Sequence, residues 1–552
     1  MTDANTEHMV RHFRQSLLWP LQLRPLEGEN ARFSPCEMLL QNQESVAWHR
    51  VEDEFTPGEG EFHERHYKEF VAFLPYVQRF VYGEYRRLLS RDDEDPPGDS
   101  ALKVFRRDDV AELRLTLREG ERPIVLSVAH VDLYFFEDID ATLLNVEVYA
   151  DNLPLDTVRD LMYRFGRAYP TGWEENGQGV HNAFSTEWLA KDGSVLAASD
   201  SGNRAKFLSF VGHHRAPCVS SHWAFLLRPL ALDPSDEPGA LRYRQVEYHR
   251  MPLMAYLAVD DPRSIAREDW LRLGLIATLH PEESLPGHDP DVVDFESRYC
   301  YDRYWTDSDA GPNTRFLCSG RAFIVVGDAR EPYFLDQERG ILAQFRHQYF
   351  LLFLIAHFHR VALLVFADKL VDAMHDLNIA EPNSVRRFKR HIRANFAAFL
   401  RFTHRYWFHE LSERPHVQAL YRLCANHLNN DALYADIKEE VQDMSHYLDS
   451  DAQRRQSSTI VRLTVVTTFS LVGTVATGFL GMNIIAEADA PMATRWGYFL
   501  LTAIGTIALS TLLIVKSKRL SDWLDVLSDE RLAGRAKLRA LVRVWRGKEI
   551  DS

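Results

Sequence analysis

Two long runs without a charged residue stand close together near the end of the chain. The first covers residues 463–486 and the second covers residues 496–515, with only a short loop between them. A helix rises about 1.5 Å per residue, so about 20 residues cross the hydrocarbon layer of a bilayer. The pattern predicts a hairpin of two transmembrane helices, at about 460–483 and 496–515. A buried hairpin within a large soluble core is the alternative, and runs of this length with basic flanks argue against it.

Basic residues flank this hairpin on both outer sides. Three precede it and three follow it: Arg454, Arg455 and Arg462, then Lys516, Lys518 and Arg519. The loop between the runs carries a single Arg and two acids. By the positive-inside rule, we expect an inner (plasma) membrane protein with both termini in the cytoplasm and residues 484–495 outside.

The chain before the hairpin divides into parts with different patterns. Residues 1–100 read as an extension that is irregular to residue 60, helical over 61–90 and linker-like over 91–100. Residues 101–338 carry β-branched and aromatic segments that predict strands, around a helix at 155–169. The expected strands lie at 113–117, 123–128, 131–136, 143–150, 206–211, 251–259 and 321–328. The sequence therefore predicts a mixed α/β domain in the cytosol.

From residue 339 to 456 the pattern is helical. An apolar stretch within 340–377 contains His357, His359 and Arg360, and a central Arg costs about 2.5–3.5 kcal/mol in a bilayer. We therefore expect a buried helix there rather than a membrane span. Neither Gly nor Pro occurs between Pro415 and Gly473, so one stalk helix can run into the first membrane segment. Its apolar seam has 3-4 spacing: Tyr434, Ile437, Val441, Met444 and Leu448. Residues 516–552 form a basic amphipathic tail.

Composition narrows the classes of function. The 552 residues carry a formal net charge of −15, which argues against nucleic acid as a partner because phosphate binding needs a basic surface. Five cysteines lie far apart, and residues 1–20 lack a signal peptide, so we expect reduced thiols in the cytosol. No phosphate loop, nucleophile elbow or HExxH helix is present, so we expect neither an enzyme nor a bound cofactor. The histidine pairs (His63/His66, His213/His214 and His357/His359) read as surface or core residues rather than metal ligands.

The first membrane run ends in the tripeptide Gly481-Met482-Asn483. This triplet stands at the outer end of the first of two predicted C-terminal membrane helices, and a long helix leads to it from an acidic α/β domain. The arrangement resembles the CorA family of divalent-cation channels. The resemblance is strong over 430–520, architectural over 100–430 and absent over the first hundred residues. It implies a CorA-like fold and a homo-oligomer, a pentamer in the family, that takes up Mg²⁺ through the lipid bilayer.

The mouth residues suit this chemistry. Mg²⁺ demands octahedral oxygen ligands and loses its water reluctantly, so a selective mouth offers neutral oxygens to the hydrated ion. Asn483 supplies an amide oxygen for hydrated Mg²⁺, and Gly481 lets the backbone bend and present carbonyls. A ring of such groups needs several copies of the chain. The alternative for Asn483 is a helix C-terminal residue that tolerates a left-handed conformation.

Small and apolar residues recur along the first membrane helix at 3-4 spacing. They predict one pore-lining face without charge: Ile460, Leu463, Thr464, Thr467, Leu471, Thr474 and Gly478. For each Thr, a hydroxyl bonded to its own backbone four residues earlier is an equally good interpretation. Asn483 follows Thr474 by nine residues, about half a turn off that face, so the helix must distort near Gly481.

Two features leave the transported ion open. The outer loop departs from the family pattern, and its Glu487 and Asp489 either attract cations or only aid solubility. The stalk acids read as sensors of cytosolic divalent ions or, more simply, as a solvated face: Asp436, Glu439, Glu440, Asp443, Asp449 and Asp451. The alternatives to Mg²⁺ are a transporter of Zn²⁺, Co²⁺ or Ni²⁺, and an enzyme or sensor held by a two-helix anchor.

Overall fold

A computed structural model describes the greater part of the chain. The described residues are 8–26, 32–41, 48–51, 64–83, 101–136, 139–239, 241–247, 249–277, 289–305, 313–375, 377–378, 382–481, 491–501, 504–505 and 508. The chain divides into two compact units, Met1–Val441 and Gln442–Ser552. The boundary falls inside one long helix, α14 (Asn430–Gly481).

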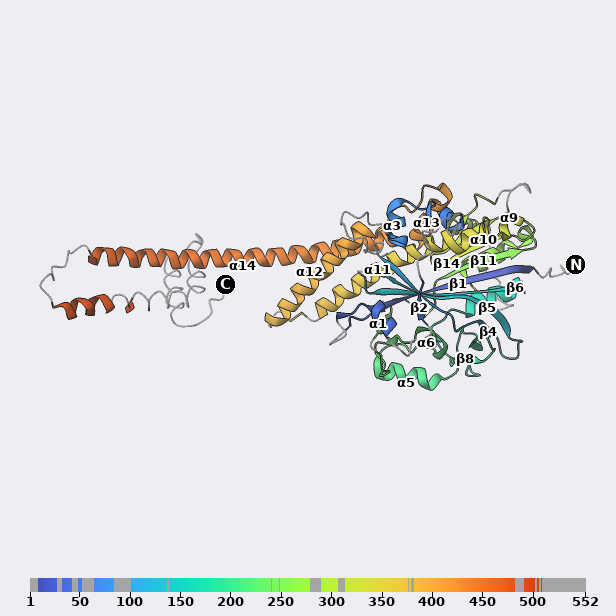
Figure 1. Ribbon diagram of the computed structural model, residues 1–552, viewed down its shortest axis with the longest axis horizontal. Helices are drawn as coiled ribbons and strands as arrows, with labels where there is room; N and C mark the ends of the chain where they lie inside the picture. Colours follow the sequence, from blue (N-terminus) through green and yellow to red (C-terminus); the bar gives the residue numbers. More distant parts are fainter. Residues whose placement is uncertain are drawn as a thin grey trace, which may run out of the picture. The chain divides into compact units, whose positions relative to one another are not determined.

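A single 14-stranded sheet organises the described residues of the first unit (Figure 1). Its main path runs β12-β13-β14-β11-β1-β6-β5-β4-β7-β8, with β10, β9, β3 and β2 attached off that path. The strands are β1 (Met9–Leu23), β2 (Trp48–Arg50), β3 (Leu102–Arg107), β4 (Glu112–Thr116), β5 (Ile124–Phe136), β6 (Ala141–Pro154), β7 (Ser185–Leu189), β8 (Val195–Ala198), β9 (Ala231–Leu232), β10 (Arg242–Gln245), β11 (Leu253–Val259), β12 (Cys300–Tyr301), β13 (Arg315–Cys318) and β14 (Ala322–Asp328). The expectation of a mixed α/β domain is confirmed.

Strand β1 corrects the prediction that residues 1–60 are irregular. It pairs antiparallel with β6 on one side, from Met9 to Gln22, and with β11 and β10 on the other. With strands on both sides and helices over both faces, β1 is buried from Phe13 to Leu23, so this part of its sequence does not alternate. Pro20 within it, opposite Leu143, also argues against a strand by sequence rules alone. Part of the predicted extension therefore supplies the middle of the sheet.

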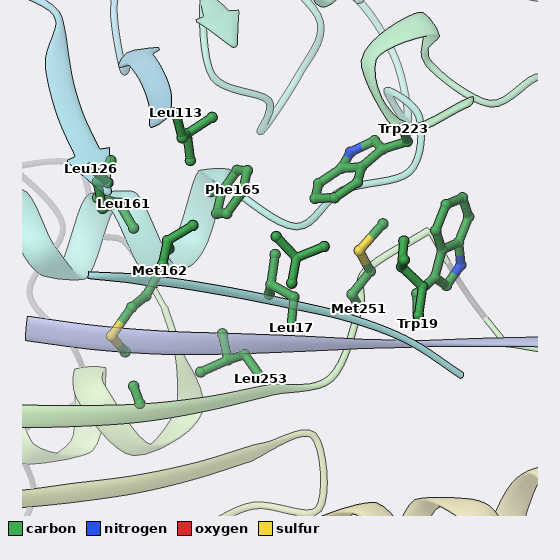
Figure 2. Close-up of a cluster of buried hydrophobic side chains, with 14 of the residues drawn as sticks. Leu17, Trp19, Leu113, Leu126, Leu161, Met162, Phe165, Trp223, Met251 and Leu253 are labelled. Carbon is green, nitrogen blue, oxygen red and sulfur yellow. The ribbon is translucent and has the colours of Figure 1, made fainter. Parts of the chain in front are cut away.

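Helices cover both faces of the sheet: α5 and α6 lie on one side and α11 on the other (Figure 1). On the first side, Leu17 and Trp19 of β1 point toward Phe165, Trp223 and Met251 (Figure 2). Apart from α2 and α3, the described helices and short turns before residue 340 are α1 (Pro35–Gln41), α4 (Leu155–Arg164), α5 (Arg204–His214), α6 (Ser221–Leu227), η2 (Pro262–Ser264), α7 (Arg267–Leu275), α8 (Asp289–Tyr299) and α9 (Pro332–Leu335).

Two predicted elements differ in the structure. The expected helix over 61–90 is two short helices within the described residues, α2 (Glu64–Phe70) and α3 (Pro75–Tyr82), because Pro75 begins a new helix. The strand expected at 206–211 is part of helix α5, whose first turn is capped by the Asn203 side chain at 3.2 Å from the Lys206 nitrogen. The cap lies outside the apolar segment, so the segment alone did not reveal it.

The apolar stretch over 340–377 is helical, as predicted. It comprises α10 (Ile341–Gln344), a π-helical turn η3 (Phe345–Tyr349) and α11 (Phe350–His375). Among the described residues, Ile341–His375 is the one helix that is long enough and apolar enough to span a membrane. However, 78% of its most apolar window is buried inside the protein. This burial confirms a core helix of the α/β unit.

Three further helices follow: α12 (Pro382–Arg405), α13 (Pro415–His427) and α14. The predicted uninterrupted helix after Pro415 is wrong at one point, because Asn429 adopts a left-handed conformation with φ 55° and separates α13 from α14. Asn tolerates this conformation better than most residues, so the break needs neither Gly nor Pro. From Asn430 onward the helix is continuous to Gly481, as expected for the stalk.

Candidate functional site

The first turn of α14 is fixed to the core helix α11. The Asn430 side chain is buried and donates a hydrogen bond to the Ala356 carbonyl at 2.9 Å. Arg360 donates to the Leu428 carbonyl at 2.6 Å and forms an ion pair with Glu247. The bond from Arg360 satisfies the Leu428 carbonyl at the α13–α14 break, where a helix end leaves carbonyls without partners. Within the first unit, the start of α14 is therefore held against the sheet domain through α11.

Aromatic rings support the same turn from the side. Tyr434 of α14 stacks on Trp407 with ring centroids 4.5 Å apart, and Trp407 lies 4.8 Å from the ring of His359. His359 donates from Nε2 to the Tyr406 carbonyl at 2.6 Å, and the Tyr421 hydroxyl lies 3.1 Å from its Nδ1. Burial lowers the pKa of His359 to about 3, so this ring is neutral at physiological pH. His359, Tyr406, Trp407 and Tyr421 are buried, and Tyr434 is half-buried at the edge of this cluster.

The predicted seam of the stalk is confirmed. Ile437, Val441 and Leu448 are buried, while Tyr434 and Met444 are half-buried. The acids on the other sides of the helix are exposed where the structure describes their side chains: Asp436, Glu439, Glu440, Asp443 and Asp449. The described residues contain no group of three or more His, Cys, Asp or Glu that could hold a metal ion. The solvated-face interpretation therefore suits these acids within one chain.

The predicted pore-lining residues all lie on α14. At about 100° per residue they fall within an arc of about 100° on one face, which also includes Gly481. The large side chains on this face are exposed to 56% at Ile460, 67% at Leu463 and 65% at Leu471. Thr464, Thr467, Thr474 and Gly478 are exposed as well. One chain therefore presents a continuous face of uncharged residues that it does not cover itself.

The threonine hydroxyls on this face bond to their own helix. Thr464 donates to the Ile460 carbonyl at 2.9 Å, Thr474 donates to the Ser470 carbonyl at 2.9 Å, and Thr467 donates to the Leu463 carbonyl. This is the alternative that the sequence left open for each Thr. The hydroxyl proton is then used, and the oxygen keeps a lone pair toward the exposed side. Such a face offers weak, neutral acceptors and no ligand that would strip water from an ion.

Four predicted site residues lie outside the described residues: Met482, Asn483, Glu487 and Asp489. Of the second apolar run, residues 496–501, 504–505 and 508 are described, and they are helical. The two-helix hairpin thus stays a prediction. The sequence analysis did not identify Asn430 and Glu247, which hold the start of α14 and its anchoring arginine. One signal in the sequence could have indicated a buried partner: Arg360 is a charged residue inside an apolar helix.

One segment of the chain matches a known protein family. Residues 379–518 match the family described as CorA-like Mg²⁺ transporter protein, a range that covers the whole of α12, α13 and α14. No curated protein matches the chain. The description of this family names a Mg²⁺ transporter. Residues 379–518 are therefore similar to the CorA-like family, and they include the helix that carries the exposed uncharged face.

Proposed function

We propose that the chain forms a homo-oligomeric divalent-cation channel, with Mg²⁺ as the favoured ion. One observation carries this proposal: the family match coincides with a helix that runs unbroken from Asn430 to Gly481 and ends at the Gly-Met-Asn tripeptide. The α14 helices of several copies surround the path, and Gly481, Met482 and Asn483 form its mouth. Both termini are cytoplasmic and residues 484–495 lie outside.

Exposed apolar side chains support a membrane setting. The large apolar residues beyond residue 456 that are more than half exposed include Ile460, Leu463, Leu471, Trp496 and Phe499. A contiguous apolar surface of this kind marks a protein or membrane interface. In the proposed assembly, lipid covers part of this surface and other copies of the chain cover the rest.

The chemistry of the path follows from what α14 offers. Hydrated Mg²⁺ presents water hydrogens outward, and carbonyl, hydroxyl and amide oxygens accept from them without replacing the water. Asn483 provides the amide oxygen and the threonine face provides hydroxyl oxygens. Because no charged group lies on the face, the ion is held weakly and can leave. An inside-negative potential contributes about 2.3 kcal/mol per charge per 100 mV to inward movement.

Replacement of Asn483 by Ala tests the proposal. Purified full-length protein is reconstituted in liposomes, and Mg²⁺ entry is followed with an entrapped fluorescent indicator. We expect Asn483→Ala to abolish Mg²⁺ flux and to leave the oligomer intact in detergent, because only the ring of amide oxygens is lost. Asn426→Ala, at an exposed position of α13, is the matched control and should transport like the wild type.

The same liposomes separate the alternatives. Preferred flux of Zn²⁺, Co²⁺ or Ni²⁺ over Mg²⁺ would assign a different ion to the same path. A wild-type protein that is monomeric and passes no divalent ion would favour the anchored enzyme or sensor. Full Mg²⁺ flux through Asn483→Ala would refute the assignment of the mouth.

A further inference from the structure

Four arginines are more than nine-tenths buried among the described residues, and one of them differs from the others. Arg14, Arg107 and Arg315 each have a carboxylate partner, with N–O distances of 2.5 Å to Glu147, 2.7 Å to Asp109 and 2.8 Å to Asp302. Arg167 is 5% exposed, and the structure shows no described carboxylate bonded to it. Because a buried unpaired charge is costly, Arg167 requires a compensating negative charge.

A second arginine increases this excess of positive charge. Arg167 and Arg250 face each other across a short antiparallel bridge, and their guanidinium carbons lie 4.7 Å and 5.5 Å from the centroid of the Tyr163 ring. Burial, together with Arg167 and Arg321, lowers the pKa of Arg250 to about 10. No described carboxylate lies close enough to shift the pKa of Arg167 or Arg250. Two like charges are thus held together without the counter-charge found at the other buried arginines.

The backbone holds this pair in place. The Ala168 nitrogen donates to the His249 carbonyl at 2.6 Å, and the Met251 nitrogen donates to the Gly166 carbonyl at 2.8 Å. Next to these bonds, Phe165 and Met251 point into the hydrophobic core (Figure 2). Arg250 also donates to the Ile276 carbonyl at 2.9 Å. The core therefore fixes the two segments and leaves the arginines little freedom to move apart.

A histidine adds a third donor. Arg167 donates to His249 Nε2 at 2.9 Å, because a guanidinium N–H can only donate. Burial and the neighbouring arginines lower the pKa of His249 to about 4, so the neutral ring carries its proton on Nδ1. The ring of Tyr169 lies 5.8 Å from that of His249, and Tyr169 also lines a pocket of about 620 Å³. His249 and Arg250 are half-buried, so the cluster is open to solvent on one side.

We propose that Arg167, Arg250 and His249 form a binding site for an oxyanion, such as the phosphate group of a small molecule. Paired guanidinium groups match the oxygens of phosphate or carboxylate, and an anion supplies the missing counter-charge. The pocket beside Tyr169 leaves room for an organic group attached to that anion. This site lies in the sheet domain and does not depend on the proposed transport of cations.

Binding of inorganic phosphate to the full-length protein in detergent tests this site by isothermal titration calorimetry. We expect saturable binding of phosphate but not of chloride at equal ionic strength. Arg250→Gln should weaken binding at least tenfold, or about 1.4 kcal/mol, because it removes one of the two charges. Arg11→Gln is the matched control: it removes a charge that Asp260 already neutralises, and it should bind phosphate like the wild type. Adenosine monophosphate in a parallel titration distinguishes an organic phosphate, which should bind more tightly, from free phosphate.

Thermal melting provides a second readout. Phosphate should raise the melting temperature of the wild type and of Arg11→Gln but not that of Arg250→Gln. Arg250 is half-buried, so this variant keeps the core packing even if Arg167→Gln fails to fold. Absence of oxyanion binding to the wild type would overturn the proposal, and so would equal binding by Arg250→Gln. These outcomes leave the result for Asn483→Ala unaffected.

Discussion

Two histidines of the first unit are neutral because their rings are buried, although each ring is hydrogen-bonded to a backbone carbonyl. His357 bonds to the Phe353 carbonyl at 3.0 Å, and His359 bonds to the Tyr406 carbonyl. Burial lowers the pKa of His357 to about 4 and that of His359 to about 3. At the residue scale, the sequence predicts that this pair are surface or core residues rather than metal ligands, and both rings are buried and bonded to backbone carbonyls.

These depressed pKa values predict loss of stability in mild acid. The unfolded chain takes up a proton on each histidine near pH 6.5, whereas the folded chain does not until about pH 3–4, so stability is complete above pH 6.5 and falls below it. From pH 7 to pH 5, His359 alone should cost about 2 kcal/mol of unfolding free energy. Thermal melts at both pH values measure the effect.

The matched variants isolate the contribution of one ring. His359→Gln should reduce the loss between pH 7 and pH 5 by about 2 kcal/mol, whatever its stability at pH 7. The same substitution at His446, whose side chain is exposed, is the matched control. An unchanged pH dependence in His359→Gln would contradict the assignment of a neutral, buried His359.

At the element scale, α14 combines two kinds of helix in one. Its first part is amphipathic, with a buried seam through Ile437 and Val441 and acids on the exposed side. Its last part carries the uncharged face from Ile460 to Gly481. No break separates them, and hydrogen bonds to α11 hold Asn430 and the Leu428 carbonyl at the start of the helix.

The seam predicts where the stalk is sensitive to substitution. Ile437→Ala removes a side chain that is 2% exposed and should lower the unfolding free energy by about 2–4 kcal/mol through the lost burial and the cavity. Glu439→Ala, two residues away on the exposed side, should change it by less than about 0.5 kcal/mol. Chemical denaturation of the two variants compares them, and equal effects would mean that the seam does not hold the stalk.

At the scale of the whole molecule, the exposed face of α14 needs partners that one chain does not supply. In the proposed oligomer, copies of Leu471 approach one another around a common path. Leu500 lies in the second apolar run and is 52% exposed, and in this arrangement it faces lipid. The two positions therefore differ in whether water and a second copy can reach them.

Cysteine substitution tests this difference. Leu471→Cys should form cross-linked dimers under mild oxidation, and a charged water-soluble thiol reagent should block its Mg²⁺ flux. Leu500→Cys should show neither effect, because lipid excludes the reagent. SDS gels without reductant and liposome flux assays measure both. Cross-linking at 500 but not at 471 would reverse the proposed orientation of the two runs.

The sequence alone determined the features that depend on local pattern. The charge-free runs, the Gly-Met-Asn tripeptide and the unbroken stretch before them pointed to the family that residues 379–518 match. The seam of α14 and the buried helix over 341–375 followed from spacing and from a central Arg, and both are confirmed. These features are visible because helical periodicity and residue type carry them without reference to distant parts of the chain.

Only the tertiary structure decided what depends on partners far away in the sequence. Strand β1 is the middle of the sheet because β6 and β11 pair with it, and its own residues give no alternating signal. The segment at 206–211 became helical through a cap outside it. The cluster of Arg167, Arg250 and His249 exists because two loops bridge, since a buried charge and its missing partner are properties of the fold and not of any local pattern.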